Sequence, residues 1–455
     1  MAGERRQATF QQLLDEGLLE IGDGYRAQNN ELGGTGPIFL RAGHVTDRHI
    51  DFAGVEHFHE HLADKVRSKM SKVGDTIITT KGNSTGRTSF VTDRLPPFVY
   101  SPHLSYWRSR DPEKLCGGFL RYWSQGVEFI EQLSGMKAST DMAPYLSLTD
   151  QRRLSVTLPP LAEQKAIAAV LGALDDKIEL NRRMNATLEA MARALFQSWF
   201  VDFDPVRAKL DDRPPDALDP ATAALFPEHL EDSPLGKKPI GWEVTVLENV
   251  LAVLETGGRP KGGVGGITSG VPSIGAESIV SVGVFDFGKT KYVPVEFHEG
   301  MRKGHIQSHD VLLYKDGGRP GEYEPHVSMF GDGFPFEKCS INEHVYRLRT
   351  SERLSQEYLY FWMTSEFALA EMRIKGTGVA IPGLNSTAVR SLGVLIPPPP
   401  IVQAFTKQAA PLFTRILANA KQSRTLATLR DTLLPKLLSG ELSVTSASAT
   451  MESSV

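Results

Sequence analysis

The sequence has few cysteines and no long apolar run, and each absence excludes a class of protein. Cys116 and Cys339 are the only cysteines among 455 residues. They are too few for a disulfide framework and lack the spacing of a metal site, which indicates a reducing compartment. No apolar run approaches the roughly 18 residues that a membrane-spanning helix needs, and the polar N-terminus lacks the apolar core of a signal peptide. We therefore expect a cytoplasmic protein that does not contact a membrane.

The chain also lacks an excess of positive charge. Its net charge is −4, although its hydrophobic content of 41% and charged content of 23% are ordinary for a globular protein. A protein that binds nucleic acid unaided is usually basic, because phosphate neutralisation supplies most of the affinity. Two alternatives follow: the chain avoids nucleic acid, or it recognises bases locally while partners hold the DNA backbone.

Sequence motifs for nucleotide binding and methyl transfer are missing as well. The Gly-rich segments 257–263 and 315–319 lack the Gly-x4-Gly-Lys-Ser/Thr spacing that cradles phosphates. The segment 95–98 (LPPF) has Leu where the Asn/Asp-Pro-Pro-aromatic motif of amino-methyltransferases has the polar residue that holds the target amino group. We predict ordinary turns and loops there, in which glycine lets the backbone approach a groove.

Two groups of metal-binding residue types have simpler interpretations. Glu163 and Lys165 have the spacing that ends a nuclease motif for Mg²⁺, but no suitably spaced carboxylate accompanies them, and they suit a solvated helix N-terminus. His57, His59 and His61 alternate, so they could share a face and bind a metal. No further ligand cluster supports that site, and surface histidines are the alternative that we expect. The sequence therefore predicts neither a catalytic nor a metal site.

What the sequence does contain is an internal repeat. Residues 137–200 match residues 375–438 at a constant shift of 238, so that Pro144 falls on Pro382. Upstream of these blocks the copies still correspond, at shifts near 235, which indicates insertions and deletions in loops. Two copies of one unit predict a molecule that meets its target with two similar surfaces.

The first part of each copy predicts strands joined by Gly-rich turns. Matched aromatic segments, 119–123 and 358–362, follow these strands. Because the loops carry the insertions, copies with different targets should diverge there. The predicted strands are 37–42 and 74–80 in copy one and 272–276 and 309–314 in copy two.

The second part of each copy predicts a long helix. From Ile167 onward apolar residues recur every three or four positions, over roughly 40 residues or about 60 Å. One apolar stripe on so long a helix indicates pairing with another helix, most simply residues 400–438. Pro411 and Pro435 predict a kink or a late start in that second helix. The expected pairing positions are Ile167, Leu174, Ile178, Asn181, Leu188 and Leu195 in the first helix and Phe405, Leu412, Ile416, Asn419, Leu426 and Leu433 in the second.

Asn181 and Asn419 occupy matching places near the apolar stripe. A polar side chain between two helices costs stability but can fix their register. The open alternative is that both side chains point to solvent. Between the copies, residues 204–239 hold seven prolines and predict a linker that either wraps a surface or stays extended.

These segments resemble one known family. Residues 158–167 (LPPLAEQKAI) and 174–181 (LDDKIELN) closely resemble the first conserved helix of type I restriction-modification specificity subunits. Residues 239–242 (PIGW) resemble that family's entry to its second target-recognition domain, and residues 433–442 (LLPKLLSGEL) its C-terminal signature. The resemblance covers nearly the whole chain. In copy two, residues 399–403 (PPIVQ) depart from the motif, which weakens the second docking surface.

The resemblance implies a fold of the α/β (α+β) class with an internal two-fold repeat. Two mixed α/β target-recognition domains would be separated by two long antiparallel coiled-coil helices. The implied segments are the first target-recognition domain at 1–158, the first spacer helix at 159–203, the Pro-rich linker at 204–239, the second target-recognition domain at 240–396, the second spacer helix at 397–442 and a disordered tail at 443–455.

The resemblance also implies a function. The chain would be a non-catalytic subunit that recognises a bipartite, asymmetric site on double-stranded DNA and docks two methylation subunits and restriction subunits. The helix pair would set the nonspecific spacer. Adenine methylation with S-adenosylmethionine and cleavage with ATP and Mg²⁺ would belong to these partners, and this chain would hold no cofactor. Two alternatives remain: a coiled-coil scaffold with two protein-binding domains, and part of a fused type II restriction-methylation enzyme.

Recognition of bases needs Arg, Lys, Asn or Gln side chains that reach base edges from loops. For any single candidate the alternative is an exposed surface cation. Lys137 and Lys375 match across the copies, which favours a shared task such as phosphate contact or loop support. The loop candidates are Arg26, Asn29, Lys81, Asn83 and Arg87 in copy one and Arg259, Lys261, Lys315 and Arg319 in copy two.

Overall fold

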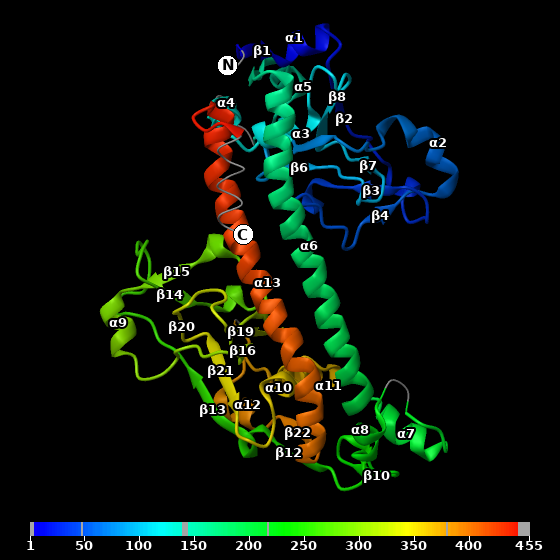
Figure 1. Cartoon of the computed structure of the whole chain (residues 1–455), viewed down its shortest axis with the longest axis vertical. Helices are drawn as coiled ribbons and strands as arrows, with labels where there is room; N and C mark the ends of the chain where they lie inside the picture. The colour runs from blue at the N-terminus through cyan, green and yellow to red at the C-terminus, as the bar shows by residue number, and fades with distance from the viewer. Residues whose placement is uncertain (1–3, 47–48, 139–143, 216–217, 379–380, 445–455) are drawn as a thin grey trace. The chain divides into compact units, whose positions relative to one another are not determined.

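The computed structural model describes residues 4–46, 49–138, 144–215, 218–378 and 381–444. They form two compact units (Figure 1). Unit 1 consists of residues 1–177 and 426–455, and unit 2 of residues 178–425. Within the described residues, no helix combines the length and the apolar character that crossing a membrane requires.

Unit 1 is built on two sheets. The larger sheet is antiparallel with strand order β2–β8–β5–β6, and the smaller has the order β4–β3–β7 with β3 and β7 parallel. A separate antiparallel pair joins β1 to β9. The elements are β1 (Arg6–Thr9), α1 (Phe10–Asp15), β2 (Leu19–Asp23), β3 (Ile38–Leu40), β4 (Glu56–His57), α2 (Ala63–Val66), β5 (Thr76–Thr79), β6 (Thr88–Phe90), β7 (Phe98–Tyr100), β8 (Leu104–Ser109), α3 (Gly117–Trp123), α4 (Val127–Ala138), α5 (Leu148–Arg153) and β9 (Ser155–Leu158).

Unit 2 repeats this topology. Its larger sheet has the order β13–β21–β16–β19, its smaller sheet the order β15–β14–β20 with β14 and β20 parallel, and β12 pairs with β22. The elements are β12 (Glu243–Val246), β13 (Leu251–Thr256), β14 (Val271–Ile274), β15 (Lys291–Val293), α9 (Val295–Gly300), β16 (Asp310–Tyr314), β17 (Gly318–Arg319), β18 (Glu322–Tyr323), β19 (Val327–Phe330), β20 (Ser340–Ile341), β21 (Val345–Thr350), α10 (Gln356–Met363), α11 (Glu366–Lys375), α12 (Ser386–Arg390) and β22 (Gly393–Ile396).

The repeated strand order confirms the mixed α/β fold class and the internal repeat that the sequence predicts. Each of the four predicted strands overlaps an observed one, namely β3, β5, β14 and β16. The two aromatic segments form α3 and α10, whose ring-bearing faces are buried. Apolar patterning therefore locates the central elements of both copies.

Two long helices carry the matched second parts of the copies. Helix α6 (Leu161–Phe200) has 40 residues and α13 (Pro399–Ser439) has 41, which confirms the predicted lengths. The expected late start of the second helix is wrong, because Pro399 and Pro400 lie in its first turn, where a missing N–H has no helical partner. Pro411 and Pro435 lie inside α13 with exposed side chains, and the buried neighbours of the helix stabilise it there.

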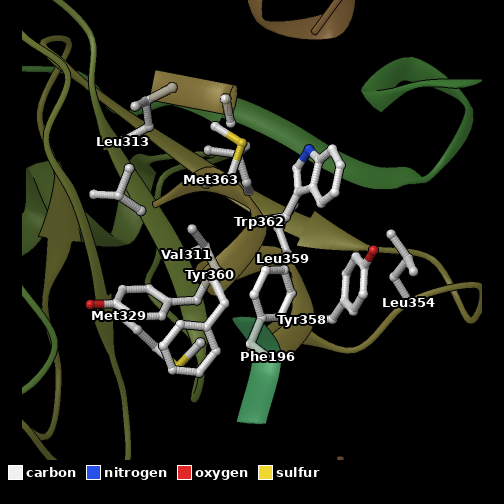
Figure 2. Close-up of a cluster of buried hydrophobic side chains, with 14 of the residues drawn as sticks. Phe196, Val311, Leu313, Met329, Leu354, Tyr358, Leu359, Tyr360, Trp362 and Met363 are labelled. Carbon is white, nitrogen blue, oxygen red and sulfur yellow. The ribbon is translucent and has the colours of Figure 1, made fainter. Parts of the chain in front are cut away.

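The hydrophobic core of unit 2 fixes the end of α6. Phe196 lies 5.3 Å from Tyr358, 5.6 Å from Phe361 and 5.9 Å from Phe405 between ring centroids. Figure 2 shows Phe196 against Tyr358 and Leu359 of α10. Aromatic rings from α6, α10 and α13 therefore share one core.

The linker between the copies is folded, which favours the first of the two predicted alternatives. It contains α7 (Asp204–Leu210), α8 (Pro220–Ala224) and the hairpin of β10 (Leu230–Ser233) and β11 (Gly236–Pro239). Its Phe226 is 2% exposed and packs on Trp199 at 5.2 Å between ring centroids. The linker thus wraps the core of unit 2 and does not stay extended. Of the predicted tail, residues 445–455 lie outside the described residues.

Candidate nucleic-acid interface

A buried ion pair supports the central strand of unit 1. The Asp75 carboxylate is fully buried and accepts hydrogen bonds from Arg108 Nε at 2.6 Å and Nη2 at 2.7 Å. Tyr100 donates its hydroxyl to the same carboxylate at 2.7 Å, and burial raises the pKa of Tyr100, so this hydroxyl stays protonated. The backbone N–H of Lys72 adds a bond of 2.8 Å. These contacts hold the start of β5 against β8.

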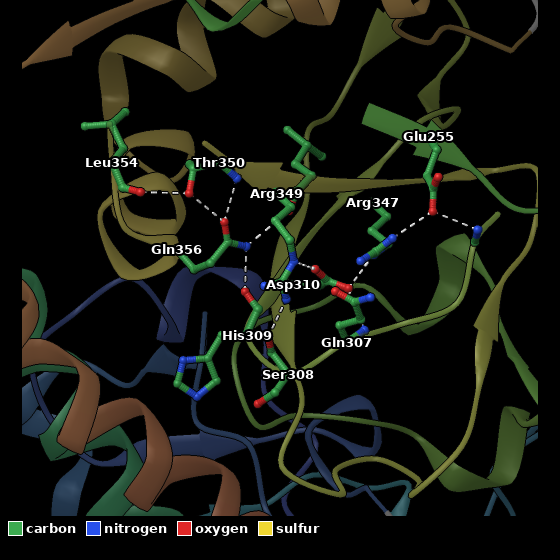
Figure 3. A network of polar contacts seen from close by, with 12 residues as sticks. Glu255, Gln307, Ser308, His309, Asp310, Arg347, Arg349, Thr350, Leu354 and Gln356 are labelled. Atoms are coloured by element: carbon green, nitrogen blue, oxygen red, sulfur yellow. Dashed lines mark hydrogen bonds and ion pairs between the residues drawn. The ribbon is translucent and has the colours of Figure 1, made fainter. Parts of the chain in front are cut away.

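Unit 2 has the equivalent arrangement around Asp310. This fully buried carboxylate accepts from Arg347 Nε, from Arg349 Nε at 2.8 Å and from the Gln307 backbone N–H at 2.6 Å. Arg347 also donates to Glu255 at 2.8 Å. Figure 3 shows how Arg347 and Arg349 converge on Asp310. The central strand of each sheet is therefore fixed at its start by a buried carboxylate and arginine.

The segment that follows the central strand of unit 1 is anchored at both ends, and we call residues 81–87 the anchored turn of unit 1. Leu146 donates its N–H to the Thr80 carbonyl at 2.9 Å, and Gly82 donates to the Pro144 carbonyl at 3.1 Å. The turn closes where Thr79 donates to the Arg87 carbonyl at 2.9 Å.

The anchored turn of unit 2, residues 316–326, has the same three hydrogen bonds. Leu384 donates to the Lys315 carbonyl at 2.9 Å, Gly317 to the Pro382 carbonyl at 2.8 Å, and Tyr314 to the His326 carbonyl at 2.9 Å. The two copies therefore present different residues from one fixed position.

The same anchors show which residues of the two turns correspond. Thr80 and Lys315 accept the equivalent hydrogen bond, so Lys81 corresponds to Asp316. By the same comparison Arg87 corresponds to His326.

The candidates of unit 1 lie in two loops. Arg87 is half-buried, and its Nη1 donates to the Val45 carbonyl at 3.1 Å, so it supports the neighbouring loop. The other candidates have exposed side chains, two of them near the end of β2 and two in the anchored turn: Arg26, Asn29, Lys81 and Asn83.

In unit 2 the structure brings Arg259 and Lys315 together around Glu343. Arg259 Nε lies 2.9 Å from Glu343 Oε1, and Lys315 Nζ donates to the Glu343 carbonyl at 3.4 Å. Both cations are therefore engaged within the unit. Lys261 and Arg319 are exposed in the loop after β13 and in the anchored turn, respectively.

Lys375 makes its contacts within unit 2, as expected for loop support, one of the two tasks predicted for it. Its Nζ donates to the Ser391 carbonyl at 2.7 Å and lies 2.8 Å from Glu371 Oε1. Glu371 accepts the Gly393 N–H at 2.9 Å.

The expected match of Lys375 with Lys137 is wrong by one residue. In unit 1 the contact equivalent to that of Glu371 is made by Gln132, which accepts the Ser155 N–H at 2.8 Å. The shift between Gln132 and Glu371 is 239, so the gapless match at 238 begins after these helices. Lys137 lies in α4, and its side chain is outside the described residues.

The metal and nuclease interpretations find no support in the structure. Among the described residues, no group of three His, Cys, Asp or Glu side chains is arranged to hold a metal ion. His59 and His61 stack with ring centroids 5.8 Å apart. Glu163 pairs with Arg5 at 2.6 Å, and Lys165 pairs at 3.2 Å with Glu113 in the loop between β8 and α3, so both residues form ion pairs at the start of α6.

In unit 2 the two long helices are joined by buried amides. Asn181 is fully buried, and its Nδ2 donates to Gln422 Oε1 at 2.9 Å. Asn419 is 2% exposed and donates to Asn185 Oδ1 at 2.9 Å, while Asn185 donates to the Ile416 carbonyl at 3.1 Å. These pairs run in antiparallel order, and neither predicted asparagine points to solvent.

In unit 1 the same helices meet at Asp175. Its carboxylate accepts from Arg430 Nη1 at 2.5 Å, from the Tyr122 hydroxyl at 2.8 Å and from Arg121. The predicted pairing positions are buried or half-buried throughout: Ile167, Leu174, Ile178, Asn181, Leu188, Leu195, Phe405, Leu412, Ile416, Asn419, Leu426 and Leu433.

A histidine beside β16 was not among the sequence candidates. His309 has φ +60°, and unit 1 has Gly74 with φ +95° at the equivalent position before Asp75. His309 Nδ1 lies 2.8 Å from Glu357 Oε1 and Nε2 lies 3.1 Å from Asp332 Oδ2. A histidine in this left-handed conformation is held by its two carboxylate partners.

We expect His309 to make unit 2 less stable as the pH rises. The hydrogen bond to Glu357 is the main cause that raises the pKa of His309. Its stabilising charge is therefore fully present below the unfolded pKa of about 6.5 and is lost as the pH rises through the higher folded pKa. Urea unfolding of the full chain and of His309→Gln across this range measures the effect, and parallel pH profiles of the two proteins would contradict it.

Comparisons with known proteins agree with this architecture. A family model described as "Type I restriction modification DNA specificity domain" matches residues 27–190. The MjaIX specificity subunit of Methanocaldococcus jannaschii, a type I restriction enzyme subunit, is 28% identical over 324 residues, which are 70% of this chain and 66% of that protein. The HindI specificity subunit of Haemophilus influenzae is 25% identical over 418 residues, 82% of this chain and 88% of that protein.

A solved structure has the same fold. The crystal structure of the S subunit of a type I restriction-modification system from M. genitalium covers 95% of this chain and 96% of its own, with a TM-score of 0.54 and 13% identity.

Proposed function

We propose that this chain is the DNA-recognition subunit of a type I restriction-modification system, because it belongs to the family of type I restriction-modification specificity subunits. Each unit would recognise one part of a bipartite target. The observation that carries this proposal is the anchored turn, which has the same backbone hydrogen bonds in both units but exposes different side chains. A constant scaffold with variable loops suits recognition of two unlike half-sites.

The partners would be double-stranded DNA, two methylation subunits and restriction subunits. We assign adenine methylation, DNA cleavage and the binding of S-adenosylmethionine, ATP and Mg²⁺ to those subunits, in the cytoplasm. The net charge of −4 supports this division, because partners would then supply most of the phosphate contacts. We also predict that the helix pair sets the length of the nonspecific DNA spacer between the two half-sites. Neither a scaffold nor a fused restriction-methylation enzyme is favoured by the relatives.

The methylated sequence in a host that carries the complete system tests the proposal. We expect sequencing of modified adenines to reveal one motif with two unequal specified parts and an unspecified spacer, and we expect the motif to disappear when this chain is deleted. Deletion and complementation with the intact chain provide the control. Persistence of the same motif without the chain would contradict the proposal.

A further inference from the structure

The anchored turn of unit 2 is longer than that of unit 1 and has a structure of its own. It spans eleven residues, 316–326, against seven in unit 1, 81–87. The additional length forms the hairpin of β17 and β18, in which Gly318 pairs with Tyr323 and Arg319 with Glu322. The seven-residue turn of unit 1 is thus too short to form the hairpin that unit 2 carries.

This hairpin is held firmly at its base. Tyr323 is 2% exposed and donates its hydroxyl to the Tyr314 carbonyl. Gly376, just after α11, lies so close that a Cβ there would be 2.4 Å from Tyr323 Cβ. The hairpin therefore presents its outer side chains from a fixed position, which lowers the entropy cost of binding.

The outer side chains surround a recess of about 380 Å³. Arg319, Glu322 and Glu324 of the anchored turn line it together with Arg373 of α11, over Tyr323. The four charged side chains are exposed. Among the described residues neither arginine forms an ion pair, whereas Arg259 and Lys315 of the same unit do. Arg319 and Arg373 are thus the cations at this recess that remain available to a ligand.

The recess offers donors from two arginines and acceptors from two glutamates. Arginine can donate two N–H groups to guanine O6 and N7 in the major groove, and a glutamate can accept from cytosine N4. Asparagine and glutamine, which suit adenine, occur neither in residues 316–326 nor in α11. The chemistry of the recess therefore fits a G·C pair better than an A·T pair.

We propose that the β17–β18 hairpin is the base-recognition element of unit 2, that Arg319 contacts a guanine of a G·C pair, and that Arg373 contacts the adjacent phosphate. This rests on the proposed function as a DNA specificity subunit. Arg319 lies in the hairpin itself, whereas Arg373 lies on a helix at the rim, where a cation positions DNA without specifying sequence.

The variants Arg319→Ala, Arg319→Lys and Arg373→Ala test the proposal in the full chain within the complete system. Arg319→Ala should make one G·C position of one half-site degenerate, by about 5- to 150-fold in discrimination, and leave the other half unchanged. Arg319→Lys should keep most of the affinity but weaken the base preference, since lysine lacks the planar guanidinium that donates two parallel hydrogen bonds. Arg373→Ala should weaken binding to all sequences and reduce the salt dependence by about one charge.

Arg302→Ala is the matched control, because it removes another exposed arginine of unit 2, in the loop after α9, and should leave every base preference intact. If the wild-type system yields no defined motif, the proposed function fails. If the wild type yields a bipartite motif and Arg319→Ala and Arg319→Lys leave it unchanged, the proposal for the hairpin is overturned while the function stands. Equal relaxation of both half-sites by Arg319→Lys would overturn it too.

Discussion

Replacing Asp310 by alanine is expected to lower the free energy of unfolding of unit 2 by about 3–5 kcal/mol. The carboxylate is fully buried and receives Arg347, Arg349 and the Gln307 N–H. Without it, Arg347, which is 6% exposed, keeps Glu255 as its one counter-charge among the described residues. A buried charge that has lost its partner is costly, because neither water nor protein compensates it.

Hydrogen exchange of the β16 and β21 amides measures this effect best, because the chain has two units and need not unfold in one step. Asp316→Ala is the matched control: its carboxylate is 25% exposed and faces the half-exposed His344 at 3.0 Å, so a change of about 1 kcal/mol or less is expected. If the Asp310 and Asp316 variants lost equal stability, the buried pair would not support the strand as we describe.

The equivalent pair in unit 1 shows what sequence reasoning could and could not find. Asp75 lies directly before β5 and Asp310 is the first residue of β16, at a shift of 235, so the repeat itself marks them. Their arginine partners lie more than thirty residues further on, in β8 and β21. The apolar pattern of the sequence locates each strand, but it does not show which strands become neighbours in a sheet. The carboxylates were therefore visible in the sequence, but their partners were not.

The sequence predicts the strands and helices better than it predicts which loop cations are available to bind DNA. Gly-rich loops with cations identified Arg259, Lys315 and Arg319 alike, yet the first two are engaged by Glu343 and Asp316. Arg373 was missed because it lies on a helix, and only the fold brings it beside the hairpin. Whether a surface cation is available depends on contacts across the fold, which neither composition nor spacing records.

Replacing Asp175 by alanine should destabilise unit 1 by about 3–5 kcal/mol as well. Its carboxylate, 14% exposed, joins α6 to Arg430 of α13 and to Arg121 and Tyr122 of α3. Burial raises the pKa of Tyr122, so its hydroxyl remains a donor for this carboxylate. Loss of Asp175 leaves Arg430, whose side chain is 8% exposed, with its exposed neighbour Asp431 as the one remaining counter-charge in the described part of the chain.

The neighbouring Asp176 supplies a control one residue away. It pairs with Arg94 at 3.0 Å, but these side chains are 63% and 43% exposed, so Asp176→Ala should cost about 1 kcal/mol or less. Hydrogen exchange in the first turns of α6 and the last turns of α13 separates the two variants. Adding Arg430→Met to Asp175→Ala should recover part of the loss, because an apolar side chain there needs no counter-charge. No recovery would mean that Asp175 acts mainly through Arg121 and Tyr122, and the carboxylate would then secure α3 rather than the helix pair.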